Sequence, residues 1–95
     1  MSNVGKYVIV RTYSAGVHAG TVTEEDGKRI VLKDARRLWY WKGAFTLNDV
    51  ANKGIGTGSK IPAAVQEITL TEAIEIIQTT DAARDIIVNF PAHGG

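Results

Sequence analysis

The stretch that decides the fold runs from His18 to Ala35 and reads HAGTVTEEDGKRIVLKDA. Two runs rich in β-branched residues flank an Asp-Gly pair, and this combination predicts a β-hairpin. A type I′ turn with Asp26 and Gly27 as its two loop residues fixes the register of the strands. The facing pairs would be Glu25 with Lys28, Glu24 with Arg29 and Val22 with Val31. Opposite charges then face each other twice, which favours this register over a slip by one residue.

A glycine within the first strand of the hairpin, Gly20, predicts a sharp bend, because a side chain would clash where a strand turns a barrel corner. The residues around it, the Asp-Gly pair and the run IVLKDA together resemble the core hairpin of SH3-like and Sm-like barrels. The resemblance implies a mainly β (α+β) fold. We expect one small, strongly bent antiparallel SH3-like or Sm-like barrel with one or two short helices, as a single domain over residues 1–95.

Outside the hairpin, the chain predicts further short strands and two helices. β-branched and aromatic residues predict a strand over Lys6–Tyr13. After a break at Asp34-Ala35, alternation predicts another strand over Arg36–Lys42. A capping pattern predicts a helix over Leu47–Asn52, and a second helix starts at Thr80 and ends just before the Phe-Pro pair.

Three segments are harder to assign. The stretch Val65–Thr79 matches both helical spacing and strand alternation, and its β-branched content favours two strands around Thr71-Glu72. The glycine-rich run Gly54–Pro62 has no apolar periodicity, so we expect a mobile loop. The tail from about Pro91 to the end, which contains His93, is expected to fray.

Composition fits one folded domain of 95 residues, with 44% hydrophobic and 22% charged residues. This balance argues against a disordered chain or a membrane span. The net charge is +1, so attraction for polyanions must come from a local patch, and long nucleic acid is not the expected partner. The absence of cysteine excludes disulfide scaffolds, thiolate zinc sites and cysteine nucleophiles. The N-terminus carries no signal-peptide pattern, so a cytoplasmic location is expected.

The strongest candidate for ligand binding is the run ARRLWYWK, in which cations and flat aromatic rings alternate. On a strand, Arg37, Trp39 and Trp41 would share one face, and Arg36 would lie on the other. Arginine pairs bidentately with phosphate, and indole rings stack on bases, so the run suits a nucleotide. The alternative is that one tryptophan belongs to the core, or that the aromatic residues anchor a subunit interface.

A second group of candidates lies at the end of the first strand and in the turn that follows. Its members are Arg11, Tyr13, Ser14 and His18. Exposed amides beside Gly16 would suit an anion, and Tyr13 or His18 could stack on a base. The alternative is an ordinary turn of small and polar residues.

Catalytic and metal sites have little support in the sequence. The two histidines, His18 and His93, lack any metal-ligand spacing, and no nucleophile-base motif is present. A triad of Ser14, His18 and Asp34 matches no known motif. The run GIGTGSK is not a P-loop, because its serine precedes the lysine instead of following it. We therefore expect no enzyme activity, no cofactor and no metal.

Three stretches carry a family resemblance: YVIVRTYSAGVHAG from Tyr7, VLKDARRLWYWKGA from Val31 and LTEAIEII from Leu70. With the motif RRxWYWxGA, they resemble a family of short tailed-bacteriophage proteins of unknown function. The resemblance implies a place in the cytoplasm of an infected bacterial host, or alternatively in the virion. Small phage proteins of this size are often inhibitors of host defence, including sponges that sequester cyclic nucleotide signals, or minor virion components.

The sequence thus predicts a binding protein that captures a small phosphorylated nucleotide without chemistry. Arg36 or Arg37 would contact phosphate, and Trp39, Trp41 or Tyr13 would stack on a base. The alternatives are a virion decoration or connector protein and a direct inhibitor of a host enzyme. Small size and short strand edges favour a homo-oligomer, and no membrane partner is expected.

Overall fold

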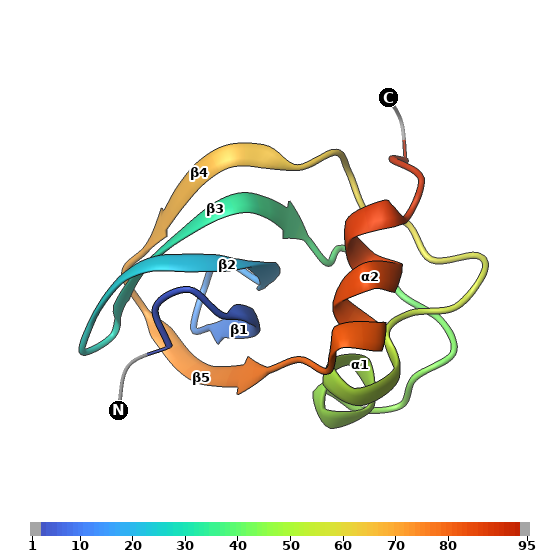
Figure 1. The fold of residues 1–95 in the computed structure, drawn as a ribbon, viewed down its shortest axis with the longest axis horizontal. Coiled ribbons are helices and arrows are strands. Elements are labelled where there is room, and N and C mark those ends of the chain that lie inside the picture. Colours follow the sequence, from blue (N-terminus) through green and yellow to red (C-terminus); the bar gives the residue numbers. More distant parts are fainter. Residues whose placement is uncertain (1–2, 94–95) are drawn as a thin grey trace.

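The computed structural model describes residues 3–93, and this part of the chain forms a five-stranded antiparallel sheet and two helices (Figure 1). The elements in chain order are β1 (Tyr7–Thr12), β2 (Val17–Asp26), β3 (Arg29–Arg37), α1 (Leu47–Lys53), β4 (Val65–Leu70), β5 (Ala73–Gln78) and α2 (Asp81–Asn89). The strand order across the sheet is β4-β3-β2-β1-β5. The predicted mainly β class with short helices is confirmed.

The two edge strands, β4 and β5, are joined by only Thr71 and Glu72, and this short link forces the sheet to curl. In a flat sheet of this order the edges would lie about 19 Å apart, since neighbouring strands are about 4.8 Å apart. Three Cα steps span at most about 11 Å. The amide of Tyr13 donates to the Glu72 carbonyl at 3.1 Å, and the amide of Ala73 donates to the Lys28 carbonyl at 3.0 Å. These hydrogen bonds fix the β4–β5 link to the ends of β1 and β3, so the sheet closes toward a small barrel (Figure 1).

The β2–β3 hairpin is present, but the predicted type I′ turn at Asp26-Gly27 is wrong by one residue. The observed pairs are Asp26 with Arg29, Glu25 with Ile30, Glu24 with Val31 and Val22 with Leu32. The turn residues are therefore Gly27 and Lys28, and only Gly27 has a positive φ, of 59°. That pattern fits a type II′ turn, in which the first loop residue alone takes positive φ. A bulge between Val22 and Glu24 takes up one residue of β2, and beyond it Val22 faces Leu32 rather than the predicted Val31.

Gly20 is the glycine that lets β2 pass close to β3. A Cβ at this position would lie 3.1 Å from the carbonyl oxygen of Lys33 and 3.2 Å from the Cα of Ala35. The register of the two strands also shifts between Ala19 and Thr21. The nearest atom is the Cβ of Leu32, at 3.0 Å, and since neither a Cβ nor backbone atoms move with a rotamer change, a side chain here would not be accommodated. The steric reason predicted for a glycine at this point is confirmed.

The predicted break at Asp34-Ala35 and the predicted strand Arg36–Lys42 are wrong. β3 continues through the expected break, with Asp34 at φ 50°, and ends at Arg37. Beyond it, Tyr40 makes a single bridge to Lys60. The strand is longer because β2 pairs with it on one side and β4 on the other. Trp39 and Trp41 therefore do not share a sheet face with Arg37.

Both predicted helices form close to their expected bounds. The Thr46 hydroxyl oxygen accepts a hydrogen bond from the amide of Asp49 at 3.2 Å and caps α1. The Thr80 hydroxyl oxygen accepts from the amide of Ala83 at 3.1 Å and caps α2. The stretch between them contains two strands around Thr71-Glu72, as the β-branched content predicted.

β1 contributes to two cores, because alternate side chains point to opposite faces of the sheet. Val8 and Val10 pack inside the curled sheet, in a cluster with residues of β2, β3, β4 and β5. Ile9 packs on the other face, in the cluster that includes Val50 of α1 and Ile87 of α2. The helices therefore cover one face of the sheet and close one end of the molecule (Figure 1).

The glycine-rich segment expected to be a mobile loop is instead packed against the body of the protein. Ile55 and Ile61 are buried in the core beneath the helices. The amide of Gly56 donates to the Lys42 carbonyl at 2.7 Å. The tail is anchored as far as His93, whose amide donates to the Ile61 carbonyl at 2.9 Å. Gly94 and Gly95, the rest of the predicted frayed tail, lie outside the described residues.

Candidate functional site

Five of the predicted site residues come together around the β1–β2 turn, and we call them the strand-end cluster. They are Arg11, Tyr13, Ser14, His18 and Arg37. The carbonyl oxygen of Ala15 organises part of this group, because it accepts from His18 Nε2 at 2.9 Å and from Arg37 Nη1 at 3.2 Å. The β1–β2 turn therefore lies at the end of the arginine-bearing strand, with His18 opposite Arg37.

His18 is a buried structural side chain rather than a stacking surface. Its ring is only 1% exposed. Burial lowers the pKa of His18; the hydrogen bond with Ala15 raises it, and the nearby charge of Arg37 lowers it further. The side chain therefore favours the neutral form and donates from Nε2 to the carbonyl. The predicted stacking of a base on His18 is wrong, because a ring with so little exposed surface has no face to offer.

Much of the hydrogen-bonding and charge capacity of the strand-end cluster is already used within the protein. Arg11 Nε lies 3.2 Å from a carboxylate oxygen of Glu75. The hydroxyl of Ser14 donates to the carboxylate of Glu72. The Tyr13 ring is 79% exposed. Two carboxylates beside two arginines leave little net charge to attract a phosphate.

Arg36, the other predicted phosphate ligand, is turned inward and is 4% exposed. Its guanidinium donates to four backbone carbonyls: Pro62 at 2.9 Å, Ile87 at 2.8 Å, Phe90 at 2.6 Å and Ile61 at 3.4 Å. Burial lowers the pKa of Arg36, and the nearby Tyr7 raises it. The expected phosphate contact by Arg36 is therefore wrong, because its donors are directed at the interior.

The two tryptophans of the run have different environments. Trp41 is half-buried and packs against the core beneath the helices. Trp39 is 65% exposed, and its ring stacks on His93 with centroids 6.0 Å apart and planes inclined by 23°. One tryptophan thus packs against the core, as one of the alternatives predicted, and the other is exposed. The partner of the exposed indole is a histidine from the C-terminal segment and not an arginine from its own strand.

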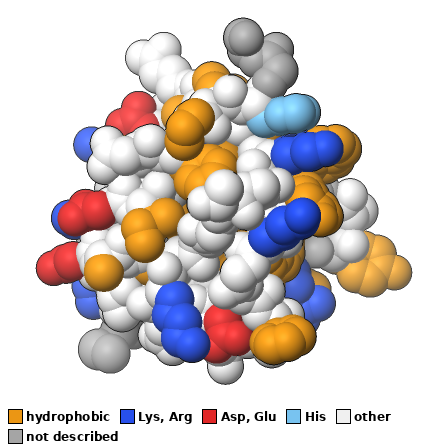
Figure 2. All heavy atoms as spheres, turned by 90° about the vertical axis from the view of Figure 1, so that its right-hand side faces the viewer, with side chains coloured by type: hydrophobic (Ala, Val, Ile, Leu, Met, Phe, Trp, Pro, Cys, Tyr) orange, Lys and Arg blue, Asp and Glu red, His pale blue; other side chains and the backbone are white. Residues whose placement is uncertain are grey.

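Cations and rings do meet, on a surface that we call the aromatic loop face. It is defined by Trp39, Tyr40, Lys42, Lys60 and His93. The ammonium of Lys60 lies 5.9 Å from the centre of the Tyr40 ring, within the range of a cation–π contact. Figure 2, which views the molecule from the helix and loop side, shows basic and hydrophobic side chains interleaved along its right-hand side, with acidic side chains mainly at the left.

A cleft of about 400 Å³ opens beside this face. One wall is Thr57, Gly58 and Ser59, and the other is the segment from Phe90 to His93. A Cβ at Gly58, where φ is 96°, would lie 3.1 Å from Lys42 Cδ and 3.7 Å from Lys42 Nζ, so the lysine side chain lies across this glycine. One wall of the cleft thus ends in His93 of the aromatic stack, and the Lys42 side chain lies against Gly58 of the other wall.

Two other hollows fit an anionic ligand less well. A larger one, of about 630 Å³, is lined by Thr23, Lys33, Asp34, Gln66 and Glu67, which are all polar and include two acids. A smaller one, of about 130 Å³, lies between His18, Arg37 and the residues after Pro62. The first lacks an aromatic surface, and the second is too small for a nucleotide, whose sites usually exceed 300 Å³.

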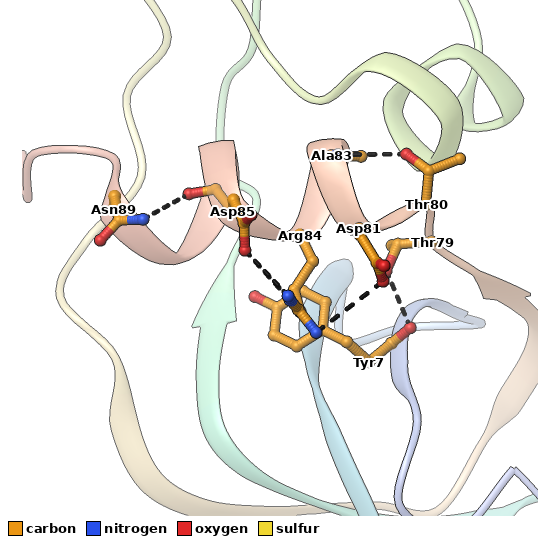
Figure 3. Close-up of polar contacts among 8 residues, drawn as sticks. All are labelled: Tyr7, Thr79, Thr80, Asp81, Ala83, Arg84, Asp85 and Asn89. Atoms are coloured by element: carbon orange, nitrogen blue, oxygen red, sulfur yellow. Dashed lines mark hydrogen bonds and ion pairs between the residues drawn. The ribbon is translucent and has the colours of Figure 1, made fainter.

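Figure 3 shows two further polar side chains near α2, Arg84 and Tyr7, and neither is a candidate for ligand binding. Arg84 is paired with carboxylates on its own helix, at 3.0 Å from Asp85 and 3.9 Å from Asp81. The hydroxyl of Tyr7 is buried and has no hydrogen-bond partner among the described residues. Burial raises the pKa of Tyr7 to about 12, so this phenol remains neutral and is no general base at physiological pH.

The comparisons with known proteins identify the family but no activity. Residues 5–87 match the family described as a domain of unknown function, DUF6948. The chain belongs to this family. No curated protein matches this DUF6948 chain. Within residues 3–93, no helix is long and apolar enough to cross a membrane.

Four residues of the aromatic loop face were not among the predicted site residues: Tyr40, Lys42, Lys60 and His93. Tyr40 and Lys42 lie within the alternating run, but the assumed strand directed attention to the other residues. Lys60 and His93 are distant in sequence, and nothing in the sequence of this DUF6948 chain pairs them with the tryptophan. The only available signal was a lysine at the end of the glycine-rich run.

Proposed function

We propose that this chain is a small binding protein that captures a phosphorylated nucleotide and does not transform it. The observation that carries the proposal is the exposed Trp39 ring stacked on His93, which itself lines the 400 Å³ cleft. Base stacking on an aromatic ring contributes about 1–3 kcal/mol and tolerates any base. Lys42, across Gly58 at the opposite wall, supplies a positive charge for a phosphate.

The size of the cleft and the charge of the surface support a small ligand over a polymer. Small-molecule sites commonly enclose about 300–1,000 Å³. With a net charge of +1, the protein as a whole has little attraction for the many phosphates of a long nucleic acid. Arg37 and Tyr13 remain solvent-exposed at the strand-end cluster, but their acidic neighbours make that surface the weaker candidate.

The finer proposal follows from the resemblance to small phage proteins. A protein that binds a cyclic nucleotide tightly and leaves it intact would act as a sponge for a host defence signal. Such a protein would work in the cytoplasm of an infected bacterium, and a homo-oligomer would bring several clefts together. The stoichiometric capture of a signal requires neither acid, base nor metal, in agreement with the lack of a catalytic motif in the sequence.

A second candidate function, docking onto another protein, is favoured by one observation. Phe45, in the loop before α1, is 98% exposed, and exposed aromatic residues are enriched at protein interfaces. The partner would be a neighbouring virion subunit or a host enzyme. This candidate predicts that Phe45→Ala abolishes the assembly or the inhibition and leaves nucleotide affinity unchanged.

Isothermal calorimetry tests the nucleotide proposal with AMP, GMP, cyclic di-AMP, cyclic di-GMP and cyclic trinucleotides. We expect at least one of them to bind with a micromolar or lower Kd, and the affinity to fall as salt is raised, since phosphate contacts are screened. Lys42→Met should weaken binding. Lys33→Met, an exposed lysine on β3 at the larger hollow, is the matched control and should leave affinity unchanged. No binding across the panel would remove the proposal.

A further inference from the structure

Arg36 is bonded to the backbone beside both walls of the cleft. On the loop side, its Nε donates to Pro62 and its Nη2 donates to Ile61, which follow the Thr57–Ser59 wall after Lys60. On the helix side, its Nη1 donates to Ile87 and Phe90, where the second wall begins. One planar side chain therefore spans the distance between two segments that are about 30 residues apart in sequence.

The acceptors on the helix side explain why a cation is stable in this interior position. The last carbonyls of a helix lack intrahelical donors and carry the negative end of the helix dipole. The last turn of α2 contains no basic residue of its own. Arg36 supplies that charge from β3, and its flat guanidinium makes four hydrogen bonds to carbonyls on two segments, one more than the three donors of a lysine allow.

We propose that Arg36 is a positioning residue that assembles the nucleotide cleft by fixing the C-terminal segment against the glycine-rich loop. The proposal rests on the proposed function for its ligand readout. Arg36 itself does not touch the ligand. It sets the distance between the Gly58 wall and the Phe90–His93 wall, and thereby brings His93 under the Trp39 ring.

The C-terminal wall lies beyond the segment that matches the family, which ends at residue 87. Arg36 therefore joins a strand of the family domain to residues outside the matched segment. The amide of His93, bonded to the Ile61 carbonyl, is the outermost link of the same connection. If this connection forms the site, its ligand preference belongs to this chain and need not extend to all members of the family.

Hydrogen exchange and calorimetry on Arg36→Met and Arg36→Lys test the proposal. Arg36→Met keeps the aliphatic part of the side chain and removes every donor, and Arg36→Lys keeps the charge without the fork. The matched control is Arg29→Met, at the far end of the same strand, where the arginine is exposed and paired with Glu24. The probes are the exchange rate of the His93 amide, a Trp39–His93 ring contact by NMR, and the Kd of the tightest-binding nucleotide in the calorimetry panel.

In Arg36→Met we expect the His93 amide to exchange at least about tenfold faster and the Kd to rise at least about tenfold, as loss of charged hydrogen bonds implies. Amides of β1 should stay protected, and Arg29→Met should match the wild type. If Arg36→Met fails to fold, Arg36→Lys tests the proposal. We expect this variant to lose the Trp39–His93 ring contact while the amides of β1 stay protected from exchange. Unchanged His93 exchange and ring contact in the folded variants would overturn the proposal. If the wild-type protein binds no nucleotide, the proposed function is removed. The hydrogen-exchange measurements on the His93 amide then still test the role of Arg36.

Discussion

The strand-end cluster and the aromatic loop face contain similar side chains but differ in what those side chains are free to do. In the strand-end cluster, Arg11 faces a carboxylate and His18 is buried against a carbonyl. On the aromatic loop face, Trp39 and Lys60 contact other rings and remain at the surface. The difference teaches that a cation or ring indicates a binding surface only when it stays exposed, without a neutralising carboxylate, after the fold has made its own contacts.

The largest expected effect on nucleotide affinity comes from removing one exposed ring from each surface and comparing the two variants. Trp39→Ala should weaken nucleotide binding by about 1–3 kcal/mol, roughly 5- to 150-fold in Kd, because a stacking surface is lost. Tyr13→Ala, at a ring that is even more exposed, should leave the Kd unchanged. Calorimetry with the same nucleotide measures both variants. The comparison fails if Tyr13→Ala weakens binding as much as Trp39→Ala does.

A smaller effect shows the structural role of the strand-end cluster. The pKa of His18 is lowered in the folded protein, so the unfolded state binds more protons as the pH falls through about 6.5, the ordinary value for histidine. Stability should therefore decrease from pH 7.5 to pH 5.5, by at most about 1.4 kcal/mol per pH unit from this group. His18→Gln, which keeps a donor but does not titrate, should have a shallower pH dependence.

Chemical denaturation at several pH values measures that slope, and calorimetry at pH 7.5 supplies the control. His18→Gln should bind nucleotide with the affinity of the wild type, because the ring does not reach the aromatic loop face. An identical pH slope in wild type and variant would contradict the structural role assigned to His18.

Local sequence patterns were sufficient to predict most of the fold. Threonine caps placed both helices, and β-branched content identified the strands on either side of Thr71-Glu72. The errors came from long-range pairing. β3 runs through Asp34 because two neighbouring strands pair with it, and the hairpin register departs from the predicted one because the turn is at Gly27-Lys28 and β2 contains irregularities.

The site could be predicted only in part, for a related reason. The alternating run correctly identified a cationic and aromatic region, and Trp39 is exposed as binding requires. The inward turn of Arg36 depends on carbonyls near residues 61 and 90, which no local pattern reports. The stack of Trp39 on His93 likewise depends on the docking of a distant segment. The local sequence thus indicates the types of residue present but not the distant groups that Arg36 and Trp39 contact.

NMR titration of the wild-type protein with the tightest-binding nucleotide tests the central claim most directly, because the two indoles provide an internal comparison. We predict saturable shifts of the Trp39 indole proton and of the Gly58 and His93 amides, with little change at the half-buried Trp41 indole. Shifts confined to Tyr13, His18 and Arg37, or equal shifts of both indoles, would contradict the account.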